Sequence, residues 1–174
     1  MKLVSIVVTL GGVAATLIVI GRAPAVIAQT PESPKTAAPA AATQPDYHPS
    51  LGDLMTLAVQ PRHIKLGLAG EQKNWAYAAY ELSELKNAFA RVGRTVPVYR
   101  NVDMPGLISG MTNAPLDALD QAIKAKDAAK FATAYATLTS TCNACHVSQE
   151  HAMIVIRTPA TNAYPDQDFR ASGR

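Results

Sequence analysis

The chain has 174 residues, a net charge of +3 and an aromatic content of 6%. This length suits one small domain with appendages, and the near-balanced charge argues against a nucleic-acid-binding surface, so no nucleic-acid partner is expected. The two cysteines, Cys142 and Cys145, lie within four residues of each other. That spacing excludes a scaffold of disulfides spread along the chain.

The N-terminal residues resemble a targeting segment more than part of a fold. Lys2 supplies a positive charge, and an apolar run extends from Leu3 to Ile20. The small-residue pattern that ends at Ala28 is typical of a signal-peptidase site, so residues 1–28 are predicted to be a signal peptide. The alternative is an uncleaved anchor, because about 18 apolar residues can just span a bilayer. Both interpretations predict export to the periplasm.

The next segment, residues 29–48, is rich in Ala and Pro and has no periodic apolar face. It cannot bury enough surface to offset its ordering entropy, so we expect a linker. Residues 49–157 are predicted to form the folded domain. Pro159 and Pro165 oppose helix formation in the remaining residues, 158–174, which predicts an irregular tail.

The first half of the domain shows two helical patterns. Apolar residues recur at helical spacing over residues 51–69, with Pro61 expected to kink this helix or break it in two. A second helix is predicted over residues 74–92, where apolar residues follow at steps of three and four. Gly93 is expected to end it.

The second half is expected to contain two more helices. Residues 94–113 are predicted to be irregular, with a single helical turn near Leu107, because Pro and Gly recur there. A third helix is predicted over residues 115–126. Asp127 then resembles an N-cap for a fourth helix that should continue to about Met153. Four amphipathic helices predict an all-α fold, an antiparallel four-helix bundle.

The fourth predicted helix carries the motif Cys142-Asn143-Ala144-Cys145-His146, the attachment pattern of haem c. Positions i, i+3 and i+4 share one helix face, so both thiols can bond to one covalently bound haem while His146 binds its iron. A thioredoxin-like dithiol would instead open a helix after a strand. A zinc site would need two further ligands at finger-like spacing, which the chain does not offer.

The segment from Lys126 to Phe131, followed by the helix that ends in the haem motif, resembles the final helix of cytochrome c′. The resemblance is most specific over residues 114–151 and extends more weakly to residues 50–92. It implies a four-helix bundle with the haem near the C-terminal helix. Some members of this class are low-spin, with a methionine of the first helix as the sixth iron ligand.

Two residues of the first predicted helix are candidates for that sixth ligand. Met55 occupies the place where cytochrome c′ puts an apolar distal residue, and a methionine there would give a low-spin His/Met iron. A methionine that only fills core space is the alternative. His63 is the other candidate ligand. It is also interpreted as a surface group or a haem-propionate partner, because Arg62 and Lys65 indicate a partly solvated stretch.

These residues predict a periplasmic one-electron carrier that exchanges electrons with redox protein partners, not an enzyme. One alternative is a five-coordinate haem protein that binds NO or CO. The absence of a basic residue at 149–151 and the presence of Leu51 in place of an arginine depart from the cytochrome c′ pattern and weaken that alternative. Another alternative is a haem subunit tethered to a membrane partner through the N-terminal apolar segment. Whether two copies pair as a homodimer is left open.

Overall fold

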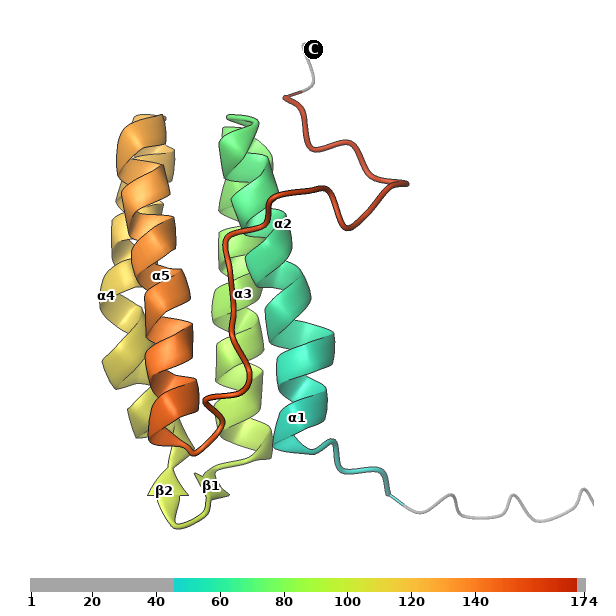
Figure 1. Cartoon of the computed structure of the whole chain (residues 1–174), viewed down its shortest axis with the longest axis vertical. Helices are drawn as coiled ribbons and strands as arrows, with labels where there is room; N and C mark the ends of the chain where they lie inside the picture. Colours follow the sequence, from blue (N-terminus) through green and yellow to red (C-terminus); the bar gives the residue numbers. More distant parts are fainter. Residues whose placement is uncertain (1–45, 172–174) are drawn as a thin grey trace, which may run out of the picture. The chain divides into compact units, whose positions relative to one another are not determined.

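The computed structural model describes residues 46–171, so the predicted signal peptide or anchor (1–28) and most of the linker lie outside the described residues. The described part is mostly helical, which confirms the all-α class (Figure 1). Its elements are, in chain order, α1 (Leu51–Leu54), the π-helix η1 (Met55–Val59), α2 (Gln60–Glu71), α3 (Trp75–Thr95), β1 (Val98–Tyr99), β2 (Val102–Asp103), α4 (Met104–Ala125) and α5 (Ala128–Ser148).

The first helical segment begins with a capping box. The Ser50 hydroxyl accepts a hydrogen bond from the Asp53 backbone N–H at 3.1 Å, and the Asp53 carboxylate accepts one from the Ser50 N–H at 2.9 Å. The discontinuity predicted at Pro61 takes the form of the π-helical turn η1. There the N–H of Gln60 reaches back to the carbonyl of Met55, five residues earlier. Pro61 then falls in the first turn of α2, where its missing N–H costs little.

Helix α2 packs closely against α5 because glycines replace larger residues at the contact. A Cβ atom at Gly67 would meet the Tyr135 hydroxyl at 2.5 Å, and one at Gly70 would collide with the Phe131 ring. Both glycines lie inside α2. Their role is therefore to permit close approach of two helices.

The prediction for residues 94–113 is wrong in most of its length. Helix α3 continues to Thr95, a short antiparallel hairpin follows, and α4 begins at Met104, eleven residues before the expected start at Pro115. The Asp103 side chain caps this helix by accepting a hydrogen bond from Gly106 N–H at 3.2 Å. One buried stripe runs the length of α4, so its packing outweighs the proline inside it; its buried residues are Met104, Ile108, Thr112, Pro115, Leu116, Leu119, Ala122 and Ile123.

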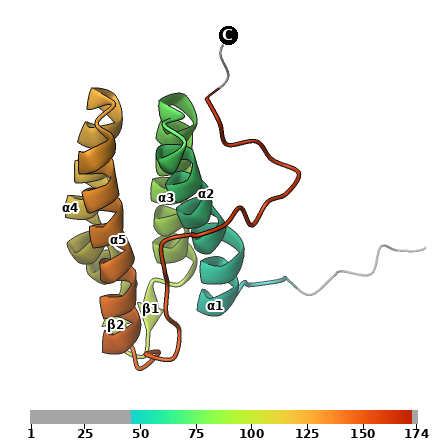
Figure 2. The same ribbon diagram turned by 45° about the horizontal axis from the view of Figure 1, so that its top comes forward.

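Helix α5 begins as predicted, with the Asp127 side chain accepting hydrogen bonds from the N–H groups of Ala129 and Lys130. It ends at Ser148 rather than near Met153. The chain then reverses, and residues 149–171, here called the C-terminal strap, run back without forming a helix or strand, first beside α5 and then against α2 and α3 (Figures 1 and 2).

The helices pack around a shared core. Helix α2 contacts α3, α3 contacts α4, α4 contacts α5, and α5 contacts α2. Each contributes a leucine with no exposed surface: Leu66, Leu85, Leu119 and Leu138. Burying one such side chain stabilises the fold by about 1.5–3 kcal/mol. Within residues 46–171, no helix is both long enough and apolar enough to cross a membrane.

Candidate functional site

A cavity of about 440 Å³ lies where η1, the start of α4 and the end of α5 meet. Its volume falls in the range of small-molecule and cofactor sites. All five residues predicted from the sequence as attachment or ligand residues line it, although they come from two separate regions of the chain, 55–63 and 142–146: Met55, His63, Cys142, Cys145 and His146. The rest of the lining is largely apolar, and includes Leu51, Val59, Phe89, Met104, Ile108 and Ile156.

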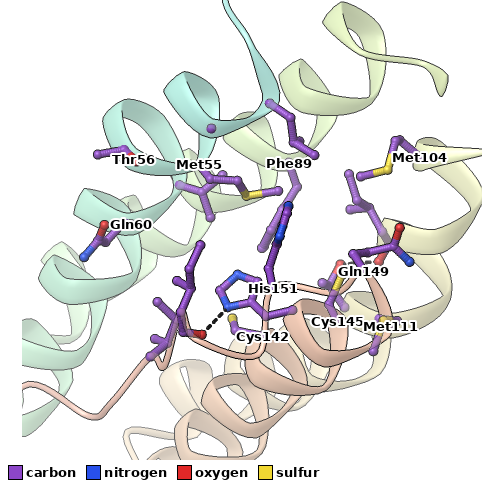
Figure 3. A pocket seen from close by; sticks show the side chains of 18 of the residues that line it. Met55, Thr56, Gln60, Phe89, Met104, Met111, Cys142, Cys145, Gln149 and His151 are labelled. Carbon is purple, nitrogen blue, oxygen red and sulfur yellow. Dashed lines mark hydrogen bonds between the residues drawn. The ribbon is translucent and has the colours of Figure 1, made fainter. Parts of the chain in front are cut away.

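Cys142 and Cys145 lie one turn apart on the face of α5 that borders the cavity (Figure 3). Both are free thiols. Burial raises the pKa of the Cys142 thiol to about 11, and it also raises the pKa of the Cys145 thiol. A redox dithiol needs a lowered pKa to supply a thiolate. The environment of these cysteines therefore argues against thioredoxin-like chemistry.

His146 follows on the same face of α5, and a hydrogen bond determines its tautomer. Its Nδ1 lies 2.8 Å from the backbone carbonyl oxygen of Ile154. A carbonyl can only accept, so Nδ1 carries the proton and donates it. In the neutral ring this leaves Nε2 as the atom with a free lone pair. Such a bond from the second ring nitrogen is what orients a metal-binding histidine.

Met55 lines the cavity from the other side. It is the first residue of η1, and its side chain is half-buried. Figure 3 shows Met55 reaching the cavity from the first helical segment, whereas Cys142 and Cys145 reach it from α5. π-Helical turns are rare and recur at functional sites, because the extra residue redirects a side chain. A thioether on this wall is a soft ligand suited to an iron porphyrin.

His63, the alternative sixth ligand, is buried, and the expectation that it sits in a partly solvated stretch is wrong. Its Nε2 lies 3.0 Å from the Thr139 hydroxyl, and its Nδ1 lies 3.0 Å from the Tyr135 hydroxyl. Burial lowers the pKa of His63 to about 4, so the ring is neutral at pH 7. Both ring nitrogens thus have partners on α5, and binding a metal would break one of these hydrogen bonds.

The two charged neighbours of His63 that suggested a solvated stretch, Arg62 and Lys65, both make contacts within the fold. Arg62 pairs with the buried carboxylate of Glu81 at 3.2 Å and with Glu84 at 3.5 Å. Lys65 lies over the ring of Tyr164, 4.5 Å from its centroid. Neither charge therefore indicates an exposed helix face.

Sequence reasoning missed several residues of the site because long-range contacts bring them there. Tyr99 of β1 lines the cavity, and its hydroxyl lies 3.2 Å from Nε2 of His151, which also lines it. Ile154 and Ile156 of the C-terminal strap form part of the wall beside His146. No local pattern in the sequence marks these four residues as neighbours.

Within residues 46–171, no group of three or more His, Cys, Asp or Glu side chains is arranged to hold a bare metal ion. The lining instead offers two thiols, three imidazoles and three thioethers around a largely apolar cavity, with His146 on the same helix as the thiols and Met55 on η1. Because a porphyrin supplies four ligands to its own iron, one or two axial protein ligands suffice for haem. Comparisons of the chain with protein-family models, curated proteins and solved structures found no match.

Proposed function

We propose that this protein is an exported monohaem c-type cytochrome that carries one electron at a time between redox protein partners. One observation carries the proposal. The motif Cys142–His146 borders, on α5, a largely apolar cavity that Met55 lines from η1. Both thiols and His146 lie on the helix face that a covalently attached haem would occupy.

The proposed fold is an antiparallel four-helix bundle. Successive helices contact each other, and α5 returns to contact α2, which closes the arrangement. The three connections between helices are short: residues 72–74, residues 96–103 with the β1–β2 hairpin, and residues 126–127. Short connections make successive helices antiparallel neighbours, and the core of such a bundle is a common cofactor site.

Each residue of the site has a defined task in this proposal. Cys142 and Cys145 would form the two thioether bonds, the S–H of each adding across one vinyl group of the haem. His146 binds the iron through Nε2 while the carbonyl of Ile154 holds Nδ1–H. Met55 is proposed as the sixth ligand. The bound haem supplies an iron that alternates between the ferrous and ferric states.

Met55 is favoured over His63 on the basis of their contacts. Both nitrogens of His63 are engaged by hydroxyl groups of α5. The Met55 side chain is half-buried at the cavity and has no hydrogen-bonding group to disengage. Methionine as an axial ligand raises the reduction potential and gives a low-spin iron, which suits electron transfer.

The optical spectrum of the full chain, with Met55→Leu compared with wild type, tests this assignment. We expect a low-spin spectrum with a near-infrared Met–Fe(III) band in the wild type and a high-spin ferric spectrum in Met55→Leu. Met153→Leu is the matched control, because Met153 is 78% exposed and does not line the cavity. It should leave the spectrum unchanged.

One result would overturn the electron-carrier proposal, and another would overturn the assignment of Met55 as the sixth ligand. A high-spin wild-type spectrum that changes on addition of CO or NO would favour the five-coordinate binding protein. A low-spin spectrum that Met55→Leu leaves unchanged would transfer the ligand assignment to His63 or to another residue of the cavity lining. N-terminal sequencing of the mature protein distinguishes cleavage after Ala28 from a retained membrane tether.

A further inference from the structure

The C-terminal strap begins with a sharp reversal against the end of α5. The N–H of His151 bonds to the carbonyl of His146 at 2.7 Å, and the N–H of Ile154 bonds to the carbonyl of His151 at 2.9 Å. Glu150 adopts a left-handed backbone conformation with φ of 62° in this turn. The strap then runs back along α5, which places the carbonyl of Ile154 against Nδ1 of His146.

Apolar burial does not hold this part of the strap. Met153 is 78% exposed, Ile154 49% and Val155 61%. A segment with so much exposed surface gains little from the hydrophobic effect, so its position depends on the hydrogen bonds it makes. Those bonds therefore determine whether the Ile154 carbonyl stays within reach of His146.

Asn143 makes a pair of hydrogen bonds that fixes the strap at Ile156, two residues beyond the carbonyl that faces His146. Its Nδ2 donates to the carbonyl of Ile156 at 2.9 Å, and its Oδ1 accepts from the N–H of Ile156 at 2.7 Å. The side-chain amide thus bonds both backbone groups of one residue. Asn143 lies between Cys142 and Cys145, so the strap is fastened to the haem motif itself.

We propose that Asn143 is a positioning residue for His146: by fixing Ile156, it holds the carbonyl of Ile154 against Nδ1–H and so aims Nε2 at the iron. This inference rests on the proposed function. This role requires a side chain that both donates and accepts a hydrogen bond. An aspartate could accept from the Ile156 N–H but could not donate to its carbonyl. An alanine could do neither.

Loss of the Asn143 hydrogen bonds is expected to change the reduction potential of the iron as well as the stability of the fold. A hydrogen bond from Nδ1 to a carbonyl increases the electron donation of the imidazole. If the strap is released, this donation weakens and the ferric state loses stabilisation. We expect the equilibrium between oxidised and reduced protein to shift toward the reduced form by about two- to tenfold, the range one hydrogen bond contributes. The reduction potential should therefore rise by up to about 59 mV for one electron.

The matched control is Asn162, an asparagine of the strap itself. Asn162 also bonds two backbone groups with its amide, donating to the Gln167 carbonyl at 3.1 Å and accepting from Tyr164 N–H at 2.7 Å. It makes no hydrogen bond to residues 154–156. Asn162→Ala therefore loses the same kind of interaction without releasing the carbonyl that faces His146.

The test compares Asn143→Ala, Asn143→Asp and Asn162→Ala in the haem-loaded full chain. Asn143→Ala should raise the potential and speed solvent exchange of the His146 Nδ1 proton, followed by NMR in the reduced protein, by at least about tenfold. In Asn143→Asp the exchange rate should fall between those of wild type and Asn143→Ala. Asn162→Ala should match wild type in both readouts. Equal potentials and exchange rates in Asn143→Ala and wild type would overturn the inference.

A measurement on the chain produced without haem separates this inference from the proposed function. Nitrogen-15 NMR reports which ring nitrogen of His146 carries the proton. The inference predicts the Nδ1–H tautomer in the wild type and a shift toward Nε2–H in Asn143→Ala. A wild-type chain that never attaches haem would contradict the function. A wild-type His146 in the Nε2–H form would contradict the inference.

Discussion

Acidification below pH 6.5 should destabilise this protein through one residue, His63. The ring is 3% exposed and lies between the hydroxyls of Tyr135 and Thr139. A neutral imidazole has one donor and one acceptor, and hydroxyl groups can serve both. Burial penalises the charged form, which lowers the pKa of His63 to about 4 from its ordinary value of 6.5.

The sign and size of the effect follow from this pKa difference. The unfolded chain binds the proton near pH 6.5, whereas the folded chain resists it until about pH 4. The contribution of His63 to stability is therefore fully present above pH 6.5 and is lost as the pH falls toward 4. A pKa difference of about 2.5, at about 1.4 kcal/mol for each pKa unit, makes this loss about 3 kcal/mol.

Urea unfolding of the full chain at several pH values between about 7 and 4 measures the loss, with His63→Gln as the comparison. Glutamine cannot titrate, so the difference between the two pH profiles isolates His63 even if the variant is less stable at pH 7. Carboxylates with lowered pKa, such as Asp168 at about 2, titrate below this window. Parallel pH profiles for wild type and His63→Gln would refute the account of a buried neutral histidine.

Two further substitutions test the packing, with unfolding free energy as the measurement. Leu138→Ala should cost about 2–5 kcal/mol because Leu138 has no exposed surface, whereas Leu57→Ala, at a side chain 74% exposed, should change stability by about 0.5 kcal/mol or less. Gly70→Ala should destabilise by about 1–3 kcal/mol because its methyl group would collide with Phe131. Gly110→Ala should stabilise α4 by up to about 1 kcal/mol, because nothing lies within 4 Å of the new methyl group. Equal effects at the two glycines would contradict the proposed contact between α2 and α5.

The placement of the cysteine motif on one face of α5 could be predicted from the sequence because the information is local. The spacing of Cys142, Cys145 and His146 places them on one helix face wherever that helix packs. Asp127 was predicted as the N-cap from its position before an apolar pattern, and the structure confirms its hydrogen bonds to the first turn.

The first half of α4 was missed because local signals and tertiary packing disagree there. Gly106, Gly110 and Pro115 each lower helix propensity, which favoured an irregular segment. The buried stripe that begins at Met104 and continues to Ile123 outweighs them. Helix propensity is a weak guide where a long apolar face of a helix packs against neighbouring helices.

The burial of His63 was missed for a geometric reason. The charged neighbours Arg62 and Lys65 indicated a solvated stretch. The prediction also assumed an ideal α-helix from Met55 onward, without the π-helical turn that the structure has at Met55–Val59. Such a turn takes one additional residue, so everything after it is rotated by ~100°. Arg62 then meets the buried Glu81, and His63 faces α5.

Mass spectrometry of the full chain, expressed with the machinery that attaches haem in the periplasm, tests the central claim most directly. The account predicts a mass equal to the polypeptide plus one haem, with the addition mapped to the peptide that contains Cys142 and Cys145. A Cys142→Ser, Cys145→Ser double variant should lack the addition. A wild-type chain recovered under the same conditions with two free thiols and no haem would contradict the account.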